Sequence, residues 1–142
     1  GVLYEGKAQT QEVFSKEVMA DLTYALKSVV NGGTGAAALG LGRPAAGKTG
    51  TSQSNASAWF SAYTPNLAAS VALFRDSASE SLNGIGGLTS VTGGTFPARI
   101  WTAFMRGALK DEPVIEFPQP ANIGGLDPIV MTSGGKQTYK KK

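Results

Sequence analysis

The sequence contains no cysteine and no histidine. The lack of cysteine excludes disulfides and thiol chemistry, and without either residue the common zinc sites cannot form. Histidine is also the usual general base near neutral pH. Hydrolytic or acyl-transfer chemistry would therefore depend on lysine, a carboxylate or a hydroxyl, and we expect no metal and no cofactor.

Long apolar runs are also missing, since no stretch approaches the roughly 20 residues of a membrane-spanning helix. Basic residues are scarce outside the C-terminal end. Residues 1–135 carry nine basic and ten acidic side chains. The remaining four of the 13 basic residues are Lys136, Lys140, Lys141 and Lys142. A nucleic-acid-binding protein usually spreads its basic residues over a folded face. We therefore expect a solvated basic tail and no nucleic-acid partner.

What is present is typical of a globular domain: 142 residues, 42% hydrophobic and 16% charged. Two helices are predicted. Residues 16–30 follow Ser15, which suits an N-cap, and end before the helix-stopping Asn31-Gly32-Gly33. Residues 97–109 begin with Pro97, which suits a first turn. Apolar residues at helical spacing make the first helix amphipathic: Phe14, Val18, Leu22, Leu26 and Val29 or Val30.

Strands are predicted at 44–51, 58–64 and 68–75, the last two forming a hairpin around Thr64-Pro65-Asn66. Residues 2–5 resemble the end of a further strand. Residues 32–47 are read as a Gly/Ala-rich loop leading into the first strand, and residues 76–95 as a polar loop. Residues 112–142 form a Pro/Gly-rich basic tail, in which we expect an occasional valine or isoleucine to pack.

Residues 42–49 match the phosphate-binding pattern G-x-x-x-x-G-K-[ST]. That loop requires a buried strand before it and a helix that begins at the lysine. Here a Gly/Ala-rich segment precedes the motif, and Gly-Thr-Ser-Gln-Ser-Asn follows it, a run of poor helix formers. The flanks disfavour a nucleotide-binding module, which stays as an alternative interpretation.

The same letters contain Lys48-Thr49-Gly50-Thr51. A Lys-Thr-Gly strand occurs in serine acyl-enzymes that lack histidine, beside a Ser-x-x-Lys and a Ser-x-Asn motif. Gly50 removes a side chain where a substrate backbone must approach, the two threonine hydroxyls suit a carboxylate, and Lys48 supplies a positive field. Trp59 and Phe60 on the next strand are expected to pack rather than to bind a ligand.

Two further segments match the companion motifs formally. They are Ser81-Leu82-Asn83 and Ser133-Gly134-Gly135-Lys136. Both follow Lys-Thr-Gly instead of preceding it, and Ser133 lies in a Gly-rich tail rather than at the start of a helix. We therefore expect neither to supply the nucleophile.

The order of the motifs over about residues 2–109 resembles the penicillin-binding proteins. In order, they are Val2-Leu3-Tyr4-Glu5, Ala20-Asp21-Leu22-Thr23, Gly33-Thr34-Gly35, Pro44-Ala45-Ala46-Gly47-Lys48-Thr49-Gly50-Thr51, Ala58-Trp59-Phe60-Ser61-Ala62-Tyr63-Thr64-Pro65, Gly93-Gly94, and the helix containing Ile100-Trp101 and Phe104-Met105. The Trp-Phe strand ending in Tyr-Thr-Pro resembles the bifunctional class A proteins more than class B.

The resemblance implies an α+β fold, with a five-stranded antiparallel sheet flanked by helices. Of these, the chain would supply about three strands and two helices, with residues 1–111 as the later part of the transpeptidase domain. The family cross-links peptidoglycan stem peptides: a serine attacks a D-alanyl-D-alanine bond, an acyl-enzyme forms, and an amine displaces it. β-Lactams acylate the same serine. The implied location is the extracytoplasmic face of the bacterial membrane, with a membrane-anchored parent protein.

Carried over by position, Lys48 would set the electrostatics of the cleft and assist proton transfer. Thr49 and Thr51 would bind the terminal carboxylate of substrate or drug beside Gly50, and the Thr51 N–H would be an oxyanion-hole donor. Ser52 and Gln53 would line the rim. Lys48 and Thr51 are thus the catalytic candidates.

The chain departs from the family in one respect, because Ser-x-x-Lys and Ser-x-Asn should precede Lys-Thr-Gly and neither does. We therefore expect the rest of the same domain to supply the nucleophile, as a separate polypeptide from a nicked or proteolysed chain. A sheet without two of its strands would expose unpaired edges. The other alternative is a non-catalytic domain that binds cell-wall peptides.

Overall fold

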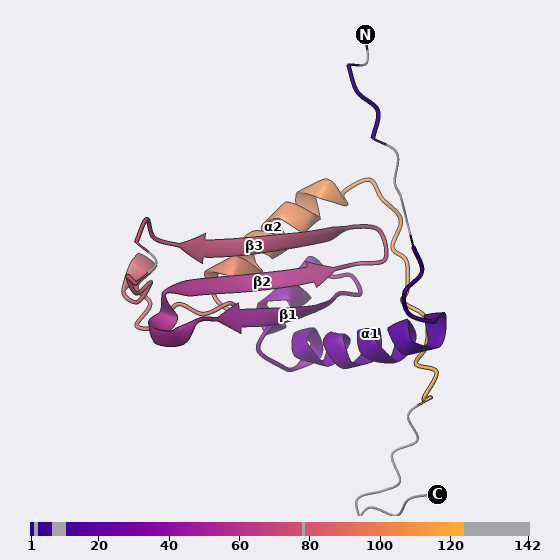
Figure 1. Ribbon diagram of the computed structural model, residues 1–142, viewed down its shortest axis with the longest axis horizontal. Coiled ribbons are helices and arrows are strands. Elements are labelled where there is room, and N and C mark those ends of the chain that lie inside the picture. Colours follow the sequence, from indigo (N-terminus) through magenta and orange to yellow (C-terminus); the bar gives the residue numbers. More distant parts are fainter. Residues whose placement is uncertain (2, 7–10, 78, 124–142) are drawn as a thin grey trace, which may run out of the picture.

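The computed structural model describes residues 1, 3–6, 11–77 and 79–123. Its main elements, in chain order, are α1 (Lys16–Asn31), β1 (Ala46–Thr51), β2 (Ser57–Tyr63), β3 (Ala68–Phe74) and α2 (Phe96–Ala108). Short 3-10 helices cover Ala36–Leu41, Gln53–Asn55 and Ile85–Gly87. In Figure 1, α2 lies behind the sheet, and α1 lies along the side of β1.

The three strands form one antiparallel sheet in the order β1-β2-β3. Lys48 pairs with Ser61 and Ser61 with Ser70, so these three residues lie in one row across the sheet. Side chains alternate between the two faces of a strand. On β2 the alternation is clear, because Phe60 is fully buried whereas Trp59 is 45% exposed. We call the face with Phe60 the core face, and the face with Lys48, Gly50, Trp59, Ser61 and Ser70 the open face.

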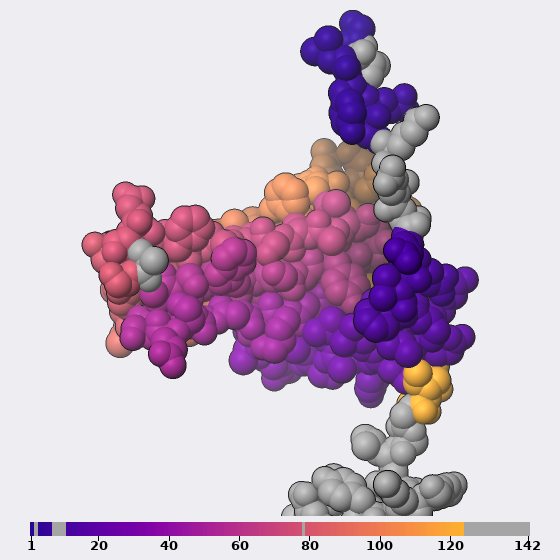
Figure 2. All heavy atoms as spheres, viewed as in Figure 1, coloured from indigo at the N-terminus to yellow at the C-terminus, as the bar shows by residue number. Residues whose placement is uncertain are grey.

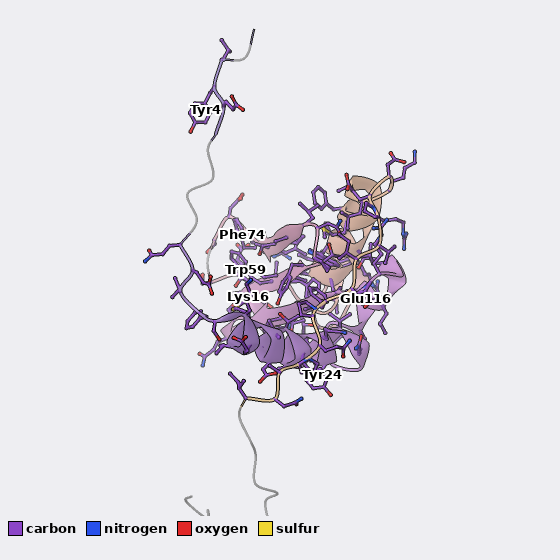
Figure 3. All side chains as sticks on the ribbon, turned by 90° about the vertical axis from the view of Figure 1, so that its right-hand side faces the viewer. Tyr4, Lys16, Tyr24, Trp59, Phe74 and Glu116 are labelled. Carbon is purple, nitrogen blue, oxygen red and sulfur yellow. The ribbon has the colours of Figure 1, made fainter. Side chains whose placement is uncertain are left out.

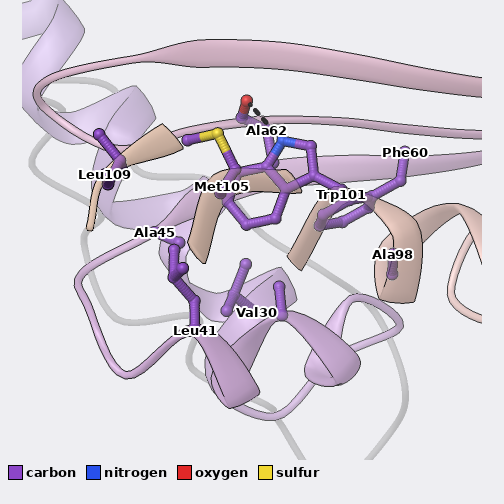
Figure 4. Close-up of a cluster of buried hydrophobic side chains, with 10 residues drawn as sticks. Val30, Leu41, Ala45, Phe60, Ala62, Ala98, Trp101, Met105 and Leu109 are labelled. Carbon is purple, nitrogen blue, oxygen red and sulfur yellow. Dashed lines mark hydrogen bonds between the residues drawn. The ribbon is translucent and has the colours of Figure 1, made fainter. Parts of the chain in front are cut away.

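α2 packs on the core face through Trp101 (Figure 4). The Trp101 ring meets Phe60 edge to face at 5.4 Å between centroids. Its indole N–H donates to the carbonyl oxygens of Ala62 at 3.2 Å and Ala69 at 3.1 Å. This side chain therefore joins α2 to two strands while satisfying its one polar group. The other buried members of the cluster are Val30, Ala38, Leu41, Ala45, Ala98, Met105 and Leu109.

α1 has the predicted ends, but much of its apolar stripe is exposed. The Ser15 hydroxyl accepts the Val18 N–H at 3.3 Å, and the helix ends at Asn31, before the two glycines. The buried residues are Ala20, Thr23 and Val30. In the apolar stripe, Val18 is 38% and Leu22 is 46% exposed, so the described chain leaves this part of the stripe uncovered. Apolar periodicity identifies the helix, but it does not say which body covers the stripe.

The exposed stripe of α1 adjoins the open face of the sheet. Between them lies a hollow of about 480 Å³, lined among others by Leu26, Lys48, Ser61, Tyr63 and Ser70. In Figure 2 the atoms of the strands are uncovered across this face. Figure 3 shows Trp59 and Phe74 on the side of the sheet away from α2.

Beyond α2 the chain returns along α1. The Arg43 guanidinium donates to the carbonyl oxygens of Leu109, Glu112 and Pro113, which fixes the turn. Phe117 is buried and meets Tyr63 edge to face at 5.5 Å. The valine and isoleucine side chains of the described part of this segment do not pack as predicted, since Val114, Ile115 and Ile123 are exposed. Ile129 and Val130 lie outside the described residues.

The returning segment ends on the Asp21 carboxylate. This group accepts the backbone N–H groups of Asn122 at 2.8 Å and Ile123 at 2.9 Å. Both bonds lower the pKa of Asp21, because each favours the ionised carboxylate. The Asn122 N–H has the larger effect.

Other predictions need correction. Residues 3–5 form no strand of the described chain, and Leu3 and Tyr4 are fully exposed or nearly so. Figure 3 shows Tyr4 far from the sheet. The predicted loop 32–47 contains the 3-10 helix Ala36–Leu41, which buries Ala38 and Leu41. β1 begins at Ala46 rather than at residue 44. Residues 124–142, and with them Ser133 and Lys136, lie outside the described residues.

Candidate active site

The Lys48-Thr49-Gly50-Thr51 segment lies on β1, an edge strand of the described sheet. The Ser52 N–H donates to the Ser57 carbonyl at 3.0 Å, so Ser52 points its backbone groups at β2. Because these groups alternate along an antiparallel strand, the Thr51 N–H and the Thr49 carbonyl point away from β2. The Lys48 ammonium reaches the same edge and donates to the Thr49 carbonyl at 2.9 Å.

The two threonine hydroxyls each have a hydrogen-bond partner on the core-face side of β1. The Thr49 Oγ1 lies 2.6 Å from the Thr34 Oγ1, and the Thr51 Oγ1 accepts the Gly93 N–H at 3.2 Å. Sequence reasoning did not assign a role to Thr34 or Gly93. The one available signal was their glycine-rich setting, Gly33-Thr34-Gly35 and Gly93-Gly94, which is typical of close backbone approach.

Both glycines of the Gly93-Gly94 pair contact other backbone groups. A Cβ at Gly93 would overlap the Trp59 carbonyl and lie 2.8 Å from that of Gly50. A Cβ at Gly94 would overlap the Thr34 carbonyl. The loop before α2 is thus packed directly against β1 and β2, and the Gly93 carbonyl also accepts the Ala98 N–H of α2 at 3.1 Å.

The geometry contradicts the phosphate-loop alternative. Lys48 lies in the middle of β1, where such a loop would begin a helix. The residues before the strand include the 3-10 helix Ala36–Leu41 rather than a buried strand. The nucleotide-binding interpretation of residues 42–49 is therefore wrong.

Comparison with known proteins then assigns the family. The model of the penicillin-binding protein transpeptidase domain matches residues 4–81, more than half of the chain. The chain belongs to the penicillin-binding protein transpeptidase family. The predicted family is therefore confirmed.

Relatives place the chain among the 1A-type members of this family. Penicillin-binding protein 1A of Mycolicibacterium smegmatis is 35% identical over 120 residues, 81% of this chain and 15% of that protein. The structure of the penicillin-binding protein PonA1 from Mycobacterium tuberculosis has a TM-score of 0.70 and 34% identity, covering 78% of this chain and 29% of that one. PonA1 in complex with penicillin V gives a TM-score of 0.69 at 34% identity, over 78% of this chain and 30% of that one.

The chain thus spans about 15% of the length of the curated relative described above. Transpeptidase domains of these relatives extend beyond it. The likeness confirms the predicted α+β transpeptidase fold, of which the chain holds three strands. The roles of single site residues in this transpeptidase segment stay predictions.

Ser52 and Gln53, the predicted rim residues, lie in the turn after β1. The Ser52 hydroxyl accepts the Ser57 N–H at 2.7 Å and so closes the turn. Gln53 opens the short 3-10 helix Gln53–Asn55. The Asn55 side-chain amide donates to Asn83 Oδ1 and to Ser90 Oγ, both at 2.7 Å, which ties this turn to the loop 79–95.

The Ser81-Leu82-Asn83 segment serves that loop. The Ser81 hydroxyl accepts the Asn83 N–H at 3.2 Å, and Leu82 is buried with Ala58 and Val91. That this segment is not the Ser-x-Asn motif of a transpeptidase stays a prediction.

The two aromatic residues of β2 differ in their surroundings. Phe60 packs in the core as predicted, whereas Trp59 lies on the open face and donates from Nε1 to the Ser57 hydroxyl at 3.2 Å. Within the described ranges, no three histidine, cysteine, aspartate or glutamate side chains are grouped as a metal site requires. No helix in the same ranges is long and apolar enough to cross a membrane.

Proposed function

We propose that the chain forms one wall of the active site of a peptidoglycan D,D-transpeptidase. The observation that carries the proposal is the free edge of β1, toward which the Thr51 N–H is directed beside the hydroxyls of Thr49 and Thr51. These groups suit an extended peptide that ends in a carboxylate, because such a ligand can lie along the edge like another strand. The penicillin V complex of PonA1, a relative with the same fold, supports this choice.

In the proposed reaction, a serine attacks the carbonyl carbon of a D-alanyl-D-alanine bond. The acyl-enzyme forms as terminal D-alanine leaves, and an amine of a neighbouring stem peptide then displaces the serine. The Thr51 N–H would stabilise the oxyanion of both steps, and an oxyanion-hole donor contributes roughly 10²–10³ in rate. Thr49 and Thr51 would hold the terminal carboxylate, and the Lys48 charge would favour the anion. Ser52 and Gln53 would lie at the rim.

The attacking serine would come from the rest of the same domain, which carries Ser-x-x-Lys and Ser-x-Asn. We propose that this part covers the open face and the α1 stripe. The side chains of Val18, Leu22 and Trp59 are large, apolar and exposed there. They lie beside the row of polar residues across the sheet that begins with Lys48. An exposed apolar sheet face and helix stripe are normally covered by another layer of the same fold.

Peptidoglycan stem peptides and β-lactams would then be the ligands. A reaction on peptidoglycan places the assembled enzyme on the extracytoplasmic face of the bacterial membrane, with the anchor in the parent protein. Its class would be a serine-type transpeptidase that also hydrolyses D-alanyl-D-alanine.

The test is acylation of the assembled enzyme by labelled penicillin, followed by intact mass measurement of each polypeptide. We expect the label on the segment with Ser-x-x-Lys and none on residues 1–142. Thr51→Pro, which removes the backbone N–H, should abolish acylation, whereas Thr51→Val retains the N–H and should keep part of it. If the assembly is not acylated at all, the non-catalytic cell-wall-binding alternative replaces this proposal.

A further inference from the structure

Thr34 lies behind the proposed carboxylate site, 2.6 Å from Thr49 between the two hydroxyl oxygens. A hydroxyl has one proton to donate and can accept through its lone pairs. In this pair one threonine must donate and the other accept. The direction of that bond decides whether Thr49 presents a proton or a lone pair to a ligand at the edge of β1.

Thr51 shows the arrangement that suits a carboxylate ligand, with its hydroxyl proton free to donate. Its hydroxyl oxygen accepts the Gly93 N–H at 3.2 Å, and a backbone N–H can only donate. The proton of Thr51 is thus left to donate elsewhere. An ionised carboxylate only accepts hydrogen bonds, so it requires donors from every hydroxyl that it meets.

We propose that Thr34 is a positioning residue that donates to Thr49 and so commits the Thr49 hydroxyl to donate to the ligand's carboxylate. This inference rests on the proposed function. The resulting chain runs from the Thr34 hydroxyl through the Thr49 hydroxyl to the anion. Each bond of such a chain polarises the next and strengthens it.

The backbone around Thr34 is fixed on both sides. Gly35 donates its N–H to the Val29 carbonyl at 2.9 Å, and a Cβ at Gly33 would lie 2.9 Å from the Val29 Cα. Gly94 packs so closely on the Thr34 carbonyl that no side chain fits there. Thr34 is therefore held between the end of α1 and the loop before α2. Its hydroxyl is therefore held against Thr49 by a fixed backbone, although the residue itself is exposed.

The test compares two probes in the assembled transpeptidase: penicillin V, and its methyl ester at the carboxylate. Thr34→Val keeps the shape of the side chain and removes the donor, whereas Thr34→Ser keeps the donor. We expect Thr34→Val to slow acylation by penicillin V about tenfold, the effect of one hydrogen bond to a ligand. Acylation by the ester should be almost unchanged, and Thr34→Ser should restore the rate with penicillin V. Because Thr49 carries the effect, adding Thr34→Val to Thr49→Val should cause no further loss.

The outcomes separate the two claims. An equal loss with both probes means that Thr34 only supports the fold, and no loss with either means that it has no role at the site. Both results overturn the inference and leave the proposed function intact. If the unaltered assembly is not acylated by penicillin V, the proposed function fails, and the inference fails with it. Thermal unfolding of each variant identifies any general loss of structure.

Discussion

Gly93 is the position at which one methyl group should damage the site most. The residue is buried in the loop before α2, where an added Cβ would overlap the Trp59 carbonyl. The same Cβ would lie 2.8 Å from the Gly50 oxygen and 3.0 Å from the Gly50 nitrogen. All three neighbours are backbone atoms of β1 and β2, so no side-chain rotation can relieve the overlap. Gly93→Ala must therefore move the loop and the strand apart.

Two effects of Gly93→Ala follow from that displacement. Overpacking of this kind costs about 1–3 kcal/mol of stability. A misplacement of about 1 Å at a reacting centre costs about 10²-fold in rate, and the strand that moves carries Thr51. Acylation by labelled penicillin and thermal unfolding of the assembled transpeptidase measure the two effects.

The matched control for Gly93→Ala is Gly107→Ala in α2. A Cβ at Gly107 meets nothing within 4 Å. This change should stabilise the protein by about 0.5–1 kcal/mol, because alanine is the better helix former, and should leave acylation unchanged. Wild-type acylation and stability in Gly93→Ala would refute the packing of the loop on β1.

Two further predictions concern the parts of the fold that hold the site. Trp101→Phe should lower the free energy of unfolding by about 2–4 kcal/mol, because it leaves a cavity and removes the indole N–H that the Ala62 and Ala69 carbonyls share. Trp59→Phe on the open face should change it by about 0.5 kcal/mol. Chemical denaturation measures both. The contact of Asp21 with Asn122 and Ile123 should be complete above the ordinary aspartate pKa of about 3.9, and should weaken as the pH falls through the lower pKa of the folded protein. The amide NMR shifts of Asn122 and Ile123 should change with pH as Asp21 titrates, and this pH dependence should disappear in Asp21→Asn. If the pH dependence is the same in Asp21→Asn, another group holds the segment.

Local pattern was sufficient to predict the elements but not their surroundings. The strands of the hairpin and both helices follow from alternation, capping and helix-stopping residues, which act within a few positions. Whether Val18 and Leu22 are buried depends on what packs against α1, and no local rule contains that information. The same limit explains Trp59, whose side chain stays 45% exposed on the open face of the described chain.

The site shows a similar division. The motif and its strand were predictable, because the residues after Thr49 are poor helix formers and so rule out a phosphate loop. The partners of the two threonine hydroxyls were not predictable. Thr34 and Thr49 are 15 positions apart, and Thr51 and Gly93 are 42 apart, so these contacts exist only in the folded chain.

The most direct test of the account is a crystal structure of the assembled transpeptidase after reaction with penicillin V. We predict an acyl bond to a serine outside residues 1–142. The penicillin carboxylate should lie within hydrogen-bond distance of the hydroxyls of Thr49 and Thr51, and the acyl oxygen should accept the Thr51 N–H. A carboxylate bound away from β1, or an acyl bond to a serine of this chain, would contradict the account.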